Sequence, residues 1–215
     1  METAKIRLIT LVTAMTVVAA VEIVTPFLAA AGTCSPLAAV LVARLVEALL
    51  ILAGVLVWQR SLGDVGLGRG DIVRGTAAGL GWSLAFGGAA AVVGVLLLVA
   101  EVDPLGFFVL PRFDDKATLG LFVLTGAVVA PFTEEVLFRG VMYGFFRRWG
   151  VTAALVLTTV VFVGLHLSTT SLPVTQAVGG IVFCLAYEKT RSLMTPYIIH
   201  VLGNAAMFGI GILGY

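Results

Sequence analysis

Residues 130–139 read Ala-Pro-Phe-Thr-Glu-Glu-Val-Leu-Phe-Arg and lie inside an apolar run that extends from about residue 117 to residue 147. The run is too long for one straight helix, because about 20 residues already cross the roughly 30 Å of hydrocarbon in a bilayer. Pro131 cannot donate a backbone hydrogen bond, so we expect the helix to kink or restart there. Such an irregularity is tolerated at membrane depth where it lines an interior cavity. The stretch therefore predicts a polar centre inside a membrane-spanning segment.

The composition extends this prediction to the whole chain of 215 residues. It is 60% hydrophobic and 12% charged, with a mean hydropathy of +1.12. A soluble domain of this size needs far more surface charge. The formal net charge of +1 gives no sign of a basic surface, so we do not expect nucleic acid as a partner. Cys34 and Cys184 lie in different segments and predict neither a disulfide nor a metal site.

The apolar runs predict an all-α fold, a polytopic transmembrane helical bundle with about seven spans. These spans are expected at residues 6–30, 37–58, 74–100, 117–147, 150–169, 173–188 and 193–213. Residues 1–60 would form an N-terminal transmembrane hairpin. Residues 61–215 would form the core, with four helices carrying the chemistry in the C-terminal half.

Basic residues in the loops predict the orientation. Nine of them fall on one side of this topology: Lys5, Arg7, Arg60, Arg69, Arg74, Arg147, Arg148, Lys189 and Arg191. The other side receives only Arg112 and Lys116, among the acidic residues Glu101, Asp103, Asp114 and Asp115. The positive-inside rule then places the N-terminus in the cytoplasm and the C-terminus outside. We expect an integral protein of a prokaryotic cytoplasmic (inner) membrane.

Ionisable residues near mid-membrane are costly and usually serve a function. Glu135 and Arg139 are four residues apart, so they share a helix face and can pair. Glu134 points about 100° away from them and is free for another partner. If Pro131 restarts the helix, both glutamates lie in its first turn, where the helix dipole favours negative charge. Glu22 and Arg44 are expected at similar depth and predict an ion pair between the first two spans, with Glu47 also inside the membrane.

Both histidines of the chain lie in later spans. His166 follows Phe162 by four residues and His200 precedes Asn204 by four, so each pair shares one helix face. A carboxylate and an imidazole that converge can hold and deprotonate a water molecule. A second imidazole and an amide can donate hydrogen bonds to a developing oxyanion. The simpler alternative is that the histidines and Asn204 only make interhelical hydrogen bonds and that Phe162 only packs.

The motifs Glu134-Glu135-x-x-x-Arg139, Phe162-x-x-x-His166 and His200-x-x-x-Asn204, in this order, resemble those of the CPBP family of intramembrane endopeptidases. That family includes the type II CAAX prenyl proteases and the Abi bacteriocin-immunity proteins. The resemblance covers about residues 60–215 and implies a hydrolase that cuts a membrane-associated protein or peptide. The substrate would be a CAAX-type tail, a leader or a C-terminal sorting signal.

By this resemblance, Glu134 and His166 would activate water, while His200 and Asn204 would stabilise the oxyanion and Glu135 and Arg139 would order the site. The enzyme would be glutamate-dependent, with no cofactor favoured. Zinc remains the alternative, held by Glu134, His166 and His200. Other readings of the same residues are a non-catalytic scaffold or immunity protein with this fold, or a transporter.

Overall fold

The computed structural model describes residues 6–32, 34–104, 113, 115–167 and 174–213. Every regular element in these ranges is helical, which confirms the predicted all-α class. The main helices run in chain order as α1 (Leu8–Ala30), α2 (Pro36–Gln59), α3 (Arg69–Val99), α4 (Lys116–Val123), α5 (Ala130–Glu135), α6 (Gly144–Phe146), α7 (Val151–Leu165), α8 (Val174–Thr190) and α9 (Met194–Leu213). Short 3-10 turns lie at Leu62–Val65 and Arg147–Trp149.

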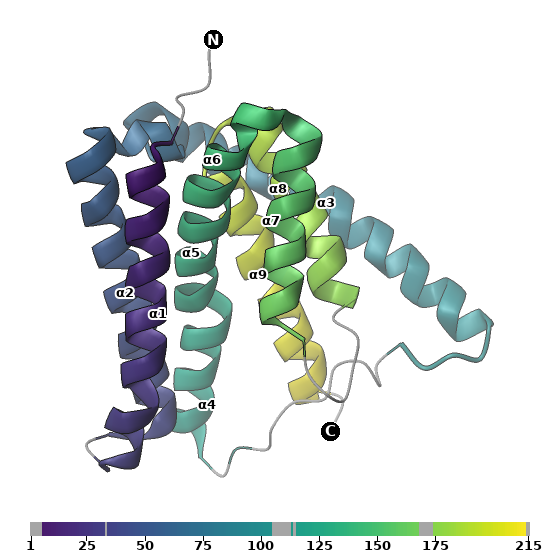
Figure 1. Cartoon of the computed structure of the whole chain (residues 1–215). Coiled ribbons are helices and arrows are strands. Elements are labelled where there is room, and N and C mark those ends of the chain that lie inside the picture. The colour runs from purple at the N-terminus through teal and green to yellow at the C-terminus, as the bar shows by residue number, and fades with distance from the viewer. Residues whose placement is uncertain (1–5, 33, 105–112, 114, 168–173, 214–215) are drawn as a thin grey trace.

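In the part of the chain that the structure describes, the predicted spans correspond to seven helical rods, because α4, α5 and α6 form one rod with the turns between them (Figure 1). Five helical stretches within the described residues are long and apolar enough to cross a membrane: Leu8–Ala30, Pro36–Gln59, Leu62–Val99, Lys116–Trp149 and Met194–Ile212. Helices α7 and α8 have 15 and 17 residues. These are fewer than the roughly 20 residues of a perpendicular span, so full crossings by α7 and α8 stay a prediction.

Pro131 does not restart the fourth span. The backbone stays in the right-handed helical region on both sides of α5, and wider π-helical turns flank it at Leu124–Val129 and Val136–Tyr143. A π turn re-routes hydrogen bonds within a helix, so the missing proline donor is absorbed without a break. The two adjacent glutamates therefore lie mid-helix. The expectation that they occupy a helix N-terminus is wrong.

This rod is the centre of the bundle. All eight residues of Val136–Tyr143 are buried. The apolar ones among them pack in the main hydrophobic core together with side chains of α1, α2, α7 and α8. A helix buried on every side is surrounded by other helices. The Glu-Glu-Arg motif thus lies where the bundle is most enclosed.

Helices α1 and α2 pack against each other beside the central rod (Figure 1). Arg44 pairs with Glu22, which confirms the predicted ion pair, and also with Glu47 at 2.6 Å. The hydroxyl of Thr133 donates to the backbone carbonyl of Arg44 at 2.8 Å. This bond fixes α2 against α5 beside the motif. Glu47 is fully buried, and one of its carboxylate oxygens has no partner among the described residues.

Two glycines bring α3 against the start of α9. A Cβ at Gly75 would lie 1.9 Å from the Ser192 hydroxyl, and one at Gly79 would lie 2.8 Å from Ile198. Only glycine permits an approach this close. The C-terminal half of α3 then extends away from the bundle (Figure 1). The contact with α3 fixes the first turns of α9, the helix that carries His200.

Several connecting segments meet at one end of the bundle. The backbone N–H of Leu193 donates to the Gly66 carbonyl at 3.0 Å, and the Ser192 hydroxyl donates to the Asp71 carbonyl at 2.7 Å. Arg148 donates to the carbonyl of Ile6. These contacts join most of the connecting segments that the charge pattern assigned to the cytoplasmic side. Lys5 and Arg112, which were counted in the charge comparison, lie outside the described residues.

The membrane orientation is tested by reporter fusions. We expect fusions after Gly32 and after Asp103 to report an outside location, and fusions after Gly68 and after Arg148 to report a cytoplasmic one, because basic loops are retained inside. An enzyme active only outside and a fluorescent protein that folds only inside give opposite readouts at each site. An inverted pattern at the last two sites would overturn the orientation.

Candidate active site

The predicted pair Glu135–Arg139 is present and fully buried. A guanidinium N–H of Arg139 donates to Glu135 Oε1 at 3.0 Å, and both side chains have no exposed surface. A second N–H of Arg139 reaches the Gly180 carbonyl on α8 at 3.4 Å. Because each charge would be costly alone in this interior, the pair must stay intact to be tolerated.

Three aromatic rings surround the Arg139 guanidinium. Its Cζ lies 4.8 Å from the ring centre of Phe162, 5.0 Å from that of Phe183 and 5.8 Å from that of Phe138. The negative faces of such rings attract a cation, and the attraction grows when water is excluded. Nε of Arg139 has no hydrogen-bond partner among the described residues. The three rings therefore help to hold a guanidinium that makes few hydrogen bonds.

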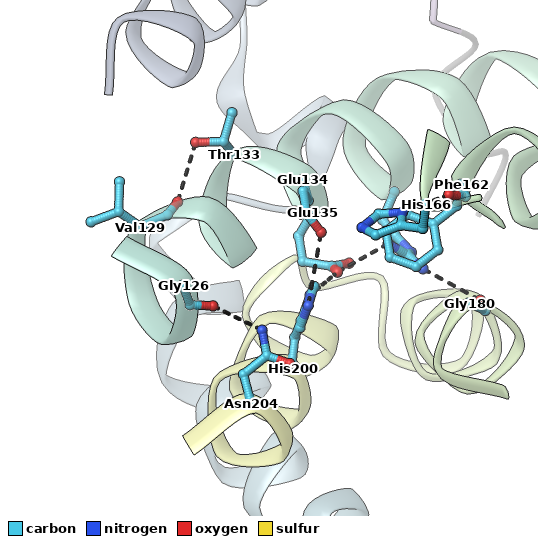
Figure 2. A network of polar contacts seen from close by, with 11 residues as sticks. Gly126, Val129, Thr133, Glu134, Glu135, Phe162, His166, Gly180, His200 and Asn204 are labelled. Carbon is cyan, nitrogen blue, oxygen red and sulfur yellow. Dashed lines mark hydrogen bonds and ion pairs between the residues drawn. The ribbon is translucent and has the colours of Figure 1, made fainter. Parts of the chain in front are cut away.

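His200 lies between the two glutamates (Figure 2). Its Nδ1 is 2.9 Å from Glu135 Oε1 and its Nε2 is 3.8 Å from Glu134 Oε2. The first contact is a hydrogen bond in which Nδ1–H donates. The second is longer than a direct hydrogen bond, and such a separation suits a bridging water or a substrate atom. The Glu134 side chain is 23% exposed, so it is the accessible carboxylate of the two.

His166 lies directly after the last residue of α7. Its Nδ1 is 2.7 Å from the Phe162 carbonyl, where only an N–H can make the bond, so Nε2 is the ring nitrogen without a partner among the described residues. The buried ring of Phe162 has its centre 4.6 Å from that of His166 and 6.4 Å from that of His200. One phenylalanine ring therefore contacts one histidine of the chain and lies near the other. Figure 2 shows His166 with Phe162 and the two glutamates.

Asn204 lies one turn after His200 on α9. Its amide donates to the Gly126 carbonyl at 2.8 Å, in the π-helical turn before α5 (Figure 2). A Cβ at Gly126 would come within 3.0 Å of the Phe208 ring, so glycine permits this approach of α9. An asparagine amide carries two N–H groups, and the second remains for another acceptor.

The structure thus brings Glu134, Glu135, Arg139 and His200 into one chain of contacts. His166 joins this chain through the ring of Phe162, while Asn204 is directed at the neighbouring turn. Sequence reasoning missed Phe183 and Gly180, which hold Arg139 from α8. An apolar residue within an apolar helix gives no signal that could have singled them out.

A three-ligand zinc site is the alternative considered from the sequence. Among the described residues, no group of three or more His, Cys, Asp or Glu side chains is placed to hold a metal ion. A catalytic zinc needs three protein ligands. Among the described residues, the three ligands considered from the sequence, Glu134, His166 and His200, do not form such a group.

Comparison with known proteins finds a family model and a curated relative that match part of the chain. Residues 116–206 match the family model "Type II CAAX prenyl endopeptidase Rce1-like". An Escherichia coli protein described as "Uncharacterized 24.3 kDa protein" is 33% identical over 118 residues, covering 51% of this chain and 54% of that protein. The chain therefore spans about half the length of this curated relative. No solved structure matches significantly. Through residues 116–206, the chain is thus similar to the Rce1-like family of type II CAAX prenyl endopeptidases.

Proposed function

We propose that this chain is an intramembrane endopeptidase that hydrolyses a peptide bond of a membrane-associated protein or peptide. The observation that carries the proposal is the 3.8 Å approach of the Glu134 carboxylate to His200 Nε2 in the enclosed centre of an apolar bundle. A substrate carbonyl oxygen that accepts from His200 Nε2 presents its carbon to a water held by Glu134. An acid–base group and an oxyanion donor then act on one carbonyl.

In the proposed first step, Glu134 removes a proton from the water while the water oxygen bonds to the carbonyl carbon. The Nε2 of His166 accepts a hydrogen bond from the second hydrogen of the water, which stays on the oxygen, and so orients the nucleophile. The carbonyl π electrons move to oxygen and give a tetrahedral oxyanion. Glu134 then returns its proton to the leaving nitrogen as the C–N bond breaks, which yields a carboxylic acid and an amine.

The oxyanion is stabilised by His200, with Asn204 as the second donor. His200 donates from Nε2 while Nδ1–H stays on Glu135, so the ring is an imidazolium during this step. The buried Glu135 carboxylate, 2.9 Å away, offsets that positive charge. Arg139 in turn holds Glu135 in place, so its role is positioning. Every step uses side chains of this chain, and none passes through a metal.

The substrate class that this site suits is a prenylated C-terminal tail, a peptide leader or a C-terminal sorting signal that is delivered within the membrane. We place the protein in a prokaryotic cytoplasmic membrane with its N-terminus inside.

The proposal is tested by mass spectrometry of the termini of membrane proteins in cells with the wild-type gene, without it, and with a His200→Gln variant. A new terminus that requires His200 names the substrate and the cut site. The purified protein should then cut that substrate in liposomes, with a chelator present. Identical termini in all three strains would favour the non-catalytic scaffold or immunity protein instead.

A further inference from the structure

Phe183 on α8 contacts two residues of the site, although it belongs to none of the three motifs. Its ring stacks on the His200 imidazole with centres 4.8 Å apart and planes 28° apart. The guanidinium of Arg139 lies 5.0 Å from the centre of the same ring. One buried side chain therefore joins the central rod to α9 at the point where the proposed oxyanion donor lies.

The plane of this ring is fixed by its surroundings. Gly179 lies one turn earlier on α8, and a Cβ there would come 3.4 Å from two atoms of the Phe183 ring. On its other sides, the ring belongs to a small core with Ala186 and Ile199, against which Trp82 and Phe86 of α3 pack. A ring enclosed in this way can define the plane of an imidazole that stacks on it.

The hydrogen bond to Glu135 fixes one atom of His200 but not the plane of its ring. A single bond at Nδ1 lets the imidazole swing about that contact, and Nε2 would then turn away from Glu134. Stacking on Phe183 removes this freedom. The negative face of the ring also attracts both Arg139 and a protonated His200, two cations that would otherwise repel each other across Glu135.

We propose that Phe183 is a positioning residue that holds the His200 imidazole with Nε2 toward Glu134. Its catalytic consequence rests on the proposed function, whereas its hold on His200 does not. The first experiment therefore observes the histidine ring directly.

The chain has only two histidines, so nitrogen NMR of protein labelled with ¹⁵N-histidine gives two ring systems, and a His166→Gln sample assigns them. In Phe183→Leu we expect the His200 ring signals to shift and broaden. The matched control is Phe145→Leu, because Phe145 is equally buried at 6% and also lies beside an arginine, Arg148, but outside the site. Phe145→Leu should leave the His200 signals in place.

Measurements of peptide cleavage test whether the electron density of the Phe183 ring matters. Phe183→Leu should lower kcat by up to about 100-fold with little change in KM, because a displaced catalytic group costs rate rather than binding. Replacement of Phe183 by phenylalanines with one, two and three ring fluorines keeps the shape and weakens the negative face stepwise. We expect kcat to fall stepwise along that series, which a packing role alone does not predict.

Unchanged His200 signals in Phe183→Leu, or a fluorine series with flat kcat and flat His200 shifts, would overturn the proposal. Because the fluorinated rings are nearly isosteric, this result can be read even if the leucine variant unfolds. Shifted His200 signals in a wild-type protein that cuts nothing would refute the proposed function and leave the positioning role standing.

Discussion

Replacement of Glu134 by glutamine is expected to lower peptide cleavage about 10²–10⁴-fold, which is the usual loss when a general acid–base group is removed. Glutamine keeps the size of the side chain but cannot take a proton from water. Glu134 forms no part of the buried pair that holds the helix, and its side chain is partly accessible. The variant should therefore insert, purify and melt like the wild type. Initial cleavage rates and thermal unfolding in the same detergent check both halves of this expectation.

The matched control is Glu22→Gln. Glu22 is another carboxylate within a membrane-spanning helix and is half-exposed, but it pairs with Arg44 on the N-terminal hairpin. We expect this variant to keep at least about half of the wild-type rate, since its charge contacts none of the reacting groups. If Glu134→Gln kept more than about a tenth of the activity, Glu134 would not be the base.

Hydropathy predicted the helical rods well because burial in lipid dictates long apolar runs. The first two predicted spans, 6–30 and 37–58, differ from α1 and α2 by at most two residues at either end. The π-helical turns around α5 were not predictable, because a backbone hydrogen bond that spans one more residue leaves no trace in the spacing of the side chains. The start of α3 at Arg69 was missed for the opposite reason, since its first turn is polar and reads as a loop.

Within the site, local spacing predicted the Glu135–Arg139 pair, because residues four apart on a helix are neighbours whatever surrounds them. The contact of His200 with both glutamates was not fixed by spacing. Depth counted along vertical helices at about 1.5 Å per residue put His200 about 12 Å from the cytoplasmic ends and Glu134 about 20 Å. Tertiary packing brings these two side chains to 3.8 Å. The catalytic roles stay predictions that the variants above test.

Replacement of Arg139 by alanine is expected to destabilise the protein as well as to abolish cleavage. The change leaves the fully buried Glu135 charge with His200 as its one remaining partner among the described residues, and a broken buried pair costs about 3–5 kcal/mol. It also empties the space between Phe138, Phe162 and Phe183. Thermal unfolding in detergent should show a clear fall in Tm. Lysine at this position should recover only part of it, because an ammonium cannot reach Glu135 and Gly180 together.

Two further variants separate charge from packing. Arg147→Ala also removes an arginine from an ion pair, but Glu188 keeps Tyr143 and Arg191 as partners and is less buried, so Tm should change little. The double variant Arg139→Ala/Glu135→Gln removes the stranded charge along with its partner. We expect it to regain stability over Arg139→Ala while remaining inactive, because His200 has then lost the carboxylate that orients it. An unchanged Tm in Arg139→Ala with cleavage lost would mean that Arg139 acts on the substrate directly and not through Glu135.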